Sequence, residues 1–166
     1  MIQYNLLPIL ASSIIPLLVG AIYYNPKVLG NAWMNACGFN EEYLKQANML
    51  KLFGYTLLLS IFLAGFIMPV VFHALHVFSL VGGQPAADSA EMRDATAFYA
   101  SYGRNFLTFK HGAFHGIMAA LFGVWPVLGI TALFERRGWK YIAIHVGFWA
   151  IVFALMGGII CAFGVK

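Results

Sequence analysis

Residues 141–163 have the sequence YIAIHVGFWAIVFALMGGIICAF, without one charged side chain. An α-helix needs about 20 consecutive apolar residues to cross the roughly 30 Å hydrocarbon core of a bilayer, and this stretch is long enough. Three more uncharged stretches of membrane-spanning length precede it, at residues 6–24, 52–81 and 111–134. The pattern predicts an all-α integral membrane protein with four transmembrane helices, which occupy residues 1–166 as a single domain.

The composition points the same way. Hydrophobic residues make up 61% of the chain and charged residues 10%, whereas a soluble domain is about 25% charged. The net charge is +4, but no basic stripe or aromatic platform accompanies it, so nucleic acid is not an expected partner. We therefore expect the lipid bilayer to surround most of the chain.

The stretch 52–81 is longer than a membrane requires. At 1.5 Å per residue it would reach about 45 Å, so the second helix is expected to tilt, bend or protrude. Pro69 is the predicted position of a bend, and Pro16 predicts a kink in the first span, because proline removes a helical hydrogen bond.

The connections carry most of the charge. In the first one, Asn40 is expected to cap a short helix that starts at Glu41, and residues 86–110 in the second one are expected to form an interfacial helix. Lysine and arginine are more frequent in the first and third connections, which predicts that both termini lie outside the cytoplasm. Four crossings place Cys37 and Cys161 on opposite sides, so we expect no disulfide between them.

Small residues recur at helical spacing in the last two spans. One stripe comprises Gly112, Gly116 and Gly123; the other comprises Ala150, Ala154 and Gly158. Small side chains let two helices approach closely, so these spans are predicted to form an antiparallel hairpin packed through the two stripes.

Histidine is the one residue type whose arrangement suggests chemistry. His73 and His76 share one side of the second span, and His111 and His115 share one side of the third. Antiparallel spans bring both pairs to the same membrane face, where four imidazoles can bind zinc or copper, or one from each helix can hold a haem iron. The alternative is that each ring donates its proton to a backbone carbonyl and serves only packing.

Two aromatic and glycine-containing stretches flank the bundle. The first, YYNPKVLGNAWM at residues 23–34, contains Tyr24, Pro26, Gly30 and Trp33. The second starts with LFERRGWKY at residues 133–141 and contains Glu135, Lys140, Gly147 and Trp149. Such residues can line a substrate vestibule, or they can simply end a helix and anchor it in the headgroup layer.

These two stretches resemble the motifs of a bacterial membrane family known as domain of unknown function 1761. The chain departs from that family's usual Trp-Tyr at Tyr23-Tyr24, and from its frequent Asn at His145. The resemblance implies a four-span protein of the inner membrane and brings no activity, cofactor or catalytic residue with it.

Motifs of serine hydrolases, P-loop proteins and zinc metalloproteases do not occur in the sequence. The small-residue stripes favour a non-catalytic accessory or structural subunit that packs with other membrane proteins of a larger inner-membrane complex, without a cofactor. One alternative is a homodimeric carrier or channel for a small solute, with proline kinks that open a cavity. The other is a membrane protein whose histidines bind a metal or haem.

Overall fold

The computed structural model describes residues 3–83 and 85–165. The first long helix consists of α1 (Leu6–Ala11), a 3-10 turn (Ser12–Ile14) and α2 (Ile15–Tyr23), and the second is α5 (Met49–Val71). In the third, α8 (Phe109–Ala119) continues through a π turn (Ala120–Val124) into α9 (Trp125–Phe134), and the fourth is α10 (Trp139–Phe163). All four are long and apolar enough to cross a membrane. The predicted all-α membrane fold is therefore confirmed.

Short helices fill the first two connections. The first connection contains α3 (Gly30–Cys37) and α4 (Glu41–Lys45), and the second contains α6 (Ala74–Leu80) and α7 (Ala90–Tyr102). The Asn40 side chain accepts a hydrogen bond from the Tyr43 amide at 2.8 Å, so the predicted cap of α4 is confirmed. The helix α3 was not expected from the sequence, where residues 23–34 were interpreted either as the lining of a vestibule or as a helix end.

The predicted second span over 52–81 was too long. The helix α5 ends at Val71, and α6 starts a separate helix after Phe72 and His73. Pro69 lies in the last turn of α5; it lacks an amide proton and crowds the carbonyl one turn back, which favours a helix end close by. In the other spans a 3-10 turn precedes Pro16, and a π turn precedes Pro126.

The helices α8 and α10 form the expected hairpin, and glycines set their separation. A Cβ atom on Gly112 would overlap the Gly157 carbonyl, and one on Gly116 would overlap the Phe153 carbonyl. Gly158 on α10 faces the ring of Phe109 in the same close way. At Gly112 and Gly116 only a residue without a side chain fits, because the atom nearest to an added Cβ at each belongs to the backbone of α10.

The remaining residues of the two stripes lie differently. Ala150 and Ala154 are half-buried on α10. Gly123 has no atom within 4 Å of the position of a Cβ, and it borders a cavity of about 580 Å³ between α5, α9 and α10. Close helix packing is thus concentrated in the first half of the third span.

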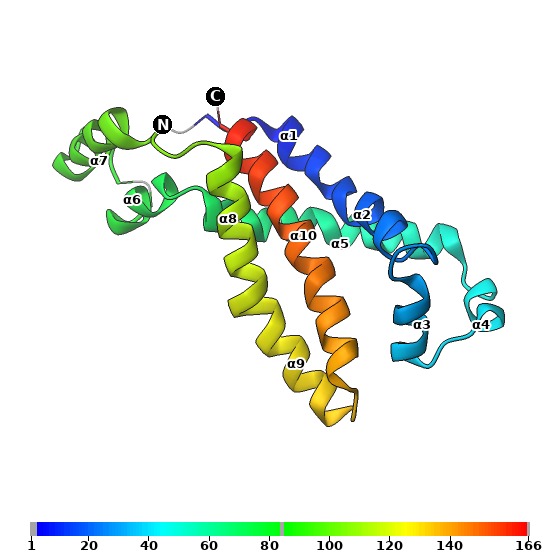
Figure 1. The fold of residues 1–166 in the computed structure, drawn as a ribbon. Helices are drawn as coiled ribbons and strands as arrows, with labels where there is room; N and C mark the ends of the chain where they lie inside the picture. Colours follow the sequence, from blue (N-terminus) through cyan, green and yellow to red (C-terminus); the bar gives the residue numbers. More distant parts are fainter. Residues whose placement is uncertain (1–2, 84, 166) are drawn as a thin grey trace.

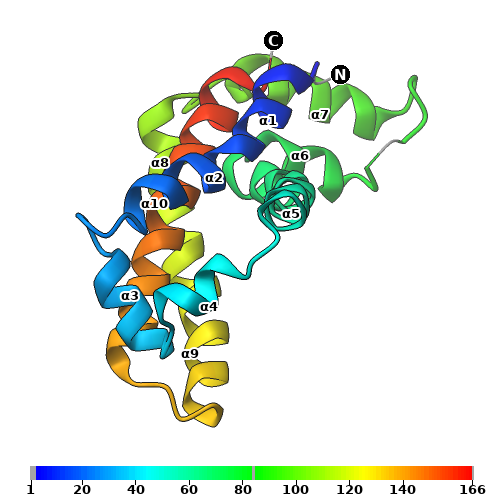
Figure 2. The ribbon, with the colours of Figure 1, turned by 90° about the vertical axis from the view of Figure 1, so that its right-hand side faces the viewer.

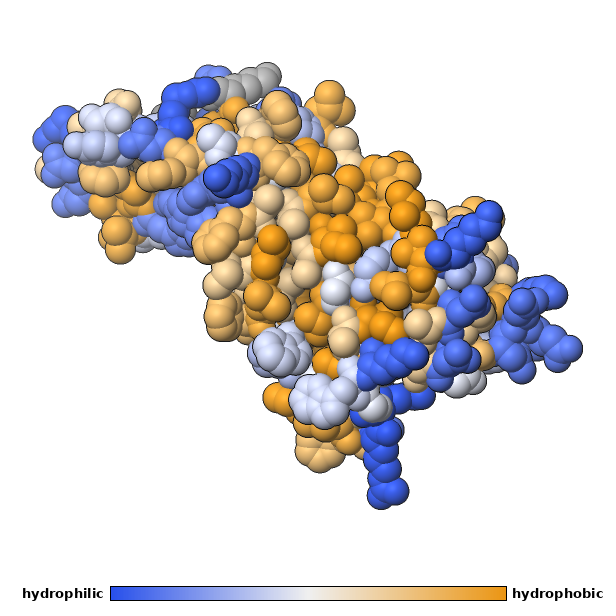
Figure 3. Space-filling view, viewed as in Figure 1, coloured by the Kyte–Doolittle hydropathy of each residue, from blue (hydrophilic) through white to orange (hydrophobic). Residues whose placement is uncertain are grey.

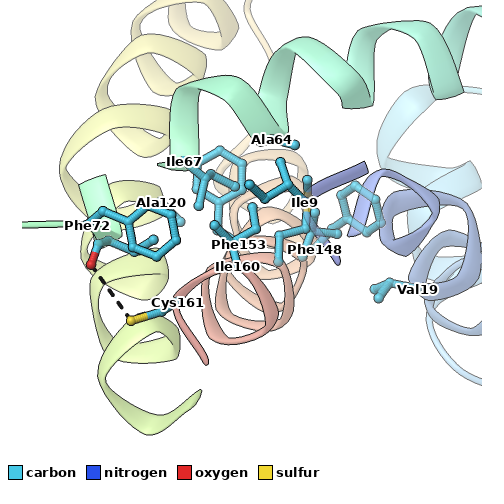
Figure 4. Close-up of a cluster of buried hydrophobic side chains, with 13 residues drawn as sticks. Ile9, Val19, Ala64, Ile67, Phe72, Ala120, Phe148, Phe153, Ile160 and Cys161 are labelled. Atoms are coloured by element: carbon cyan, nitrogen blue, oxygen red, sulfur yellow. Dashed lines mark hydrogen bonds between the residues drawn. The ribbon is translucent and has the colours of Figure 1, made fainter. Parts of the chain in front are cut away.

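The helix α5 crosses the hairpin and does not run alongside it. In Figure 1 it passes behind α8 and α10, and in Figure 2 it is seen almost end-on. The buried core forms at this crossing, where Ala64 and Ile67 of α5 meet Phe153 and Ile160 of α10, with Ile9 of α1 beside them (Figure 4). The crossing brings the end of α5 against the beginning of α8.

The surface separates into hydrophilic ends and a hydrophobic middle (Figure 3). Large apolar side chains in the middle face outward, among them Leu59 of α5, which is 65% exposed, and Phe122 of the third span, which is 73% exposed. Such exposure suits contact with lipid. The two ends of the described chain lie side by side, because the Asn5 amide donates a hydrogen bond to the Gly164 carbonyl at 2.9 Å.

Candidate metal centre

Three of the four candidate histidines converge where α5, α6 and α8 meet. His73 follows the end of α5 and stands directly before α6, because α5 stops shortly after Pro69. His111 and His115 lie one turn apart on α8. The α8 helix starts at a defined residue, since the Thr108 hydroxyl accepts a hydrogen bond from the His111 amide at 3.2 Å. The end of α5 therefore positions His73, and the start of α8 sets the position of His111 and, one turn later, of His115.

The ring nitrogens lie close together. The His73 Nε2 atom is 2.9 Å from His111 Nε2 and 3.3 Å from His115 Nε2. One potential ligand nitrogen from each of the three residues lies within 4.8 Å of the other two. His76, the fourth candidate, is exposed on α6 and lies outside this group.

Three uncharged imidazoles cannot all form favourable hydrogen bonds with one another at these distances. Each neutral ring has one N–H donor and one lone pair, so a nitrogen that faces two others makes at least one repulsive or shared contact. Partial burial, and then the positive charge that the neighbouring imidazoles would carry, lower the pKa of His73. The lowered pKa favours the neutral ring of His73, which is the form that binds metals.

The spacing suits a metal ion at the centre. A tetrahedral zinc ion with Zn–N bonds of about 2.05 Å holds two ligand nitrogens about 3.3 Å apart. The separation between His73 and His115 matches that value, and the separation between His73 and His111 is somewhat shorter. In the part of the chain that the structure describes, no carboxylate belongs to the group, so the donor set consists of imidazole alone.

Phe106 supports the group from the connection between α7 and α8. Its backbone has a φ of 67°, which is rare for a bulky residue and stores strain. Its ring stacks on His111 with 5.3 Å between centroids, and its carbonyl accepts a hydrogen bond from the Cys161 thiol at 3.4 Å. This role of Phe106 could not be predicted from the sequence, because an unusual φ depends on the tertiary contacts around the residue.

A cavity of about 380 Å³ opens beside His73. His73 forms part of its wall, together with apolar residues of α6 and aromatic residues of α7, among them Phe98 and Tyr102. A small molecule in this cavity would lie next to the His73 ring.

Residues 7–161 match the model of a family described as proteins of unknown function, DUF1761. The chain belongs to the DUF1761 family. The predicted resemblance is therefore confirmed. No curated protein and no solved structure matches the chain.

The two motif stretches of this DUF1761 protein meet in space at the beginning of α10. The ring centroid of Tyr24 lies 4.9 Å from that of Trp33 and 5.1 Å from that of Phe148. The Tyr23 hydroxyl donates a hydrogen bond to the Ile144 carbonyl at 3.0 Å. These contacts join the end of α2 to α10 across more than a hundred residues of sequence.

The glycines of the motifs allow this close approach. A Cβ on Gly30 would overlap the Tyr24 carbonyl, and one on Gly147 would lie 2.7 Å from the Tyr23 hydroxyl. The Pro26 carbonyl accepts a hydrogen bond from the Asn31 side chain at 3.2 Å, which holds the turn before α3. Trp149 is half-buried and packs on Phe148 and Phe153.

The charged motif residues lie at the turn between α9 and α10. Glu135 forms an exposed ion pair with Arg137 at 3.7 Å, and Lys140 is exposed. A solvated ion pair of this kind contributes at most about 1 kcal/mol. The structure does not bring these residues to the histidine group, which lies near the other end of α10.

Proposed function

We propose that this protein is a membrane metalloprotein in which His73, His111 and His115 bind one zinc-like divalent ion. The observation that carries the proposal is the convergence of three imidazole nitrogens from the end of α5 and from α8, at 2.9 and 3.3 Å from His73 Nε2. We place the protein in a bacterial inner membrane with both termini outside the cytoplasm, as the family resemblance and the distribution of lysine and arginine favour.

The chemistry of the donor set selects the class of ion. Imidazole suits zinc, copper, iron and nickel, whereas magnesium and calcium require oxygen ligands. Haem is a poorer fit, because its macrocycle must lie between the two axial nitrogens and a separation of 2.9 Å leaves no room for it. A single small ion is therefore the favoured ligand.

Three protein ligands leave one coordination position open. Catalytic zinc sites have this arrangement, with a water molecule in the fourth position whose pKa falls to about 7. His73 is exposed and borders the cavity of about 380 Å³, so a fourth ligand has access from that side. The proposed ion would act as a Lewis acid or as a source of hydroxide at the polar end of the bundle.

The test is metal binding by purified protein in mild detergent, after chelation and reloading with Co²⁺ or Zn²⁺. We expect one ion per chain and, with Co²⁺, the intense visible absorption of a tetrahedral site. His111→Ala and His115→Ala should each weaken binding at least about 100-fold, since each removes one of three ligands. His76→Ala is the matched control and should bind like the unaltered protein, because His76 lies outside the group.

Two results would contradict the proposal. One is a folded protein that takes up no stoichiometric metal. The other is an equal loss of metal binding in His76→Ala and His111→Ala, which would mean that binding does not depend on the three converging nitrogens.

The accessory-subunit and carrier hypotheses stay predictions. The accessory-subunit hypothesis rested on the small-residue stripes as surfaces for other proteins. Most of these residues make contacts within the chain, since Gly112, Gly116 and Gly158 all lie between α8 and α10. The cavity of about 580 Å³ beside α9 is the feature that a small-solute carrier would use.

A further inference from the structure

A second polar group lies near the other end of α10, where the two motif stretches meet. Cys37 is the last residue of α3, and its Sγ atom lies 3.8 Å from Nε2 of His145. The other ring nitrogen of His145, Nδ1, lies 3.4 Å from the Tyr24 hydroxyl. A thiol, an imidazole and a phenol thus form a chain of three groups joined by two contacts.

The order of these contacts is that of a nucleophile with its base. When Nδ1 of His145 bears the proton, it donates to the Tyr24 oxygen, and the lone pair of Nε2 faces the thiol. The thiol of Cys37 then donates its hydrogen to Nε2. A thiol beside an imidazole that a third group orients is the arrangement of cysteine nucleophiles.

The other cysteine of the chain provides an internal comparison. Cys161 is 1% exposed, and its thiol donates to the backbone carbonyls of Phe106 at 3.4 Å and Val71 at 3.8 Å, the latter drawn in Figure 4. Neither acceptor can take up a proton. Cys37 is 8% exposed and faces an imidazole, so of these two thiols only Cys37 has a base in contact.

The Cys37 thiol needs that base. Burial raises its pKa, and the nearby Arg137 guanidinium only partly opposes the effect, so the group is protonated at pH 7. A protonated thiol is a weak nucleophile until its hydrogen is removed. His145 is positioned to accept the hydrogen during attack.

The surroundings indicate the type of electrophile. Arg137 donates a hydrogen bond to the Cys37 carbonyl at 3.2 Å, and Arg136 and Lys140 lie exposed on the same turn. The turn also carries Glu135, which pairs with Arg137, so the net charge of the polar side is positive. On the apolar side, the ring of Tyr141 lies 4.3 Å from that of His145 and also lines the cavity of about 580 Å³, whose walls are mostly apolar. A substrate with an apolar chain on an anionic carrier would fit both, because the chain suits the apolar cavity and the carrier suits the cationic turn.

We propose that Cys37 is an acyl acceptor that takes a fatty acyl group from an acyl thioester with an anionic carrier. The Cys37 sulfur attacks the thioester carbonyl while its hydrogen passes to Nε2 of His145. The tetrahedral intermediate collapses by breaking the bond to the carrier sulfur, which leaves with the hydrogen from His145. The products are an acyl thioester on Cys37 and the free thiol of the carrier, with no change in oxidation state.

The experiment uses purified full-length protein in detergent micelles, with palmitoyl-coenzyme A as the probe. Acylation is measured by mass spectrometry on the peptides that contain Cys37 and Cys161, before and after neutral hydroxylamine, which cleaves thioesters. We expect acylation of Cys37 at least about 100-fold faster than of Cys161, because general-base assistance typically contributes 10²- to 10⁴-fold. His145→Gln should slow Cys37 acylation by a similar factor, with an unchanged circular dichroism spectrum.

A second arm tests the carrier. Palmitoyl-pantetheine has the same thioester without the nucleotide phosphates of coenzyme A, and we expect it to react more slowly with Cys37. Equal rates for the two donors would overturn the assignment of an anionic carrier. Equal acylation of Cys37 and Cys161, or a His145→Gln variant that reacts at the original rate, would overturn the role of Cys37 as acceptor.

The outcome is independent of the metal centre. His111 and His115 lie on α8 next to the end of α10 that holds Gly157 and Cys161, whereas His145 lies near its beginning. Loss of metal binding in His111→Ala should therefore leave acylation of Cys37 intact.

Discussion

Replacement of Gly112 by alanine should destabilise the protein by about 2 kcal/mol. An added Cβ would overlap the Gly157 carbonyl and the Cys161 side chain, so α8 and α10 must move apart. Overpacking of this kind costs about 1–3 kcal/mol, and the upper value applies here because a backbone carbonyl cannot rotate away. Alanine also gains about 1 kcal/mol in helix propensity over glycine, which leaves a net loss of about 2 kcal/mol.

The assay is unfolding in mixed micelles by titration with sodium dodecyl sulfate, followed by far-ultraviolet circular dichroism. A loss of 2 kcal/mol corresponds to a roughly 30-fold change in the unfolding equilibrium constant. Gly123→Ala is the matched control on the same span, since no atom lies within 4 Å of its Cβ position. It should be neutral or stabilising, because only the propensity gain remains.

Two results would refute the reasoning. Equal destabilisation by Gly112→Ala and Gly123→Ala would show that any added methyl group in this span is harmful. An unchanged stability of Gly112→Ala would show that the helices separate at no cost, and that glycine does not set the crossing.

Three further predictions concern the motif region. Tyr23→Phe removes the hydrogen bond to the Ile144 carbonyl and should cost about 1 kcal/mol in the same unfolding assay; no loss would mean that the bond is exchanged with water. Gly30→Ala should destabilise more strongly, because its Cβ would overlap the backbone of Tyr24 and Asn25, and a loss below that of Tyr23→Phe would contradict this. Burial raises the Cys37 pKa, so in His145→Gln its alkylation by iodoacetamide should keep rising with pH above about 8.5, where an ordinary thiol levels off; a rate that levels off near pH 8.5 would contradict the raised pKa.

The histidine group shows where sequence reasoning succeeds and where it fails. Spacing along α8 placed His111 and His115 on one face, and antiparallel spans brought them to the same end as His73. The same reasoning included His76, because it treated residues 52–81 as one helix. The helix is interrupted at Phe72 and His73, so α6 does not continue the direction of α5. Such an interruption depends on packing at the end of α5 as well as on Pro69.

The second group could not be found in this way. Cys37 and His145 are 108 positions apart, and the contact joins a short helix that the sequence did not predict to the first part of α10. The resemblance of the two motif stretches to one family was the only signal, and it did not indicate that they touch.

The membrane fold could be predicted from the residues alone, because apolar length and the placement of charges are properties of a chain in lipid and do not depend on which helices touch. The hairpin of α8 and α10 could be predicted in the same way, since small residues at helical spacing favour close approach. Three features became visible only in the folded chain: α5 crosses the hairpin, His76 stays outside the histidine group, and Cys37 contacts His145. These features depend on crossing directions and on helix ends, which many weak contacts set together and which no local pattern encodes.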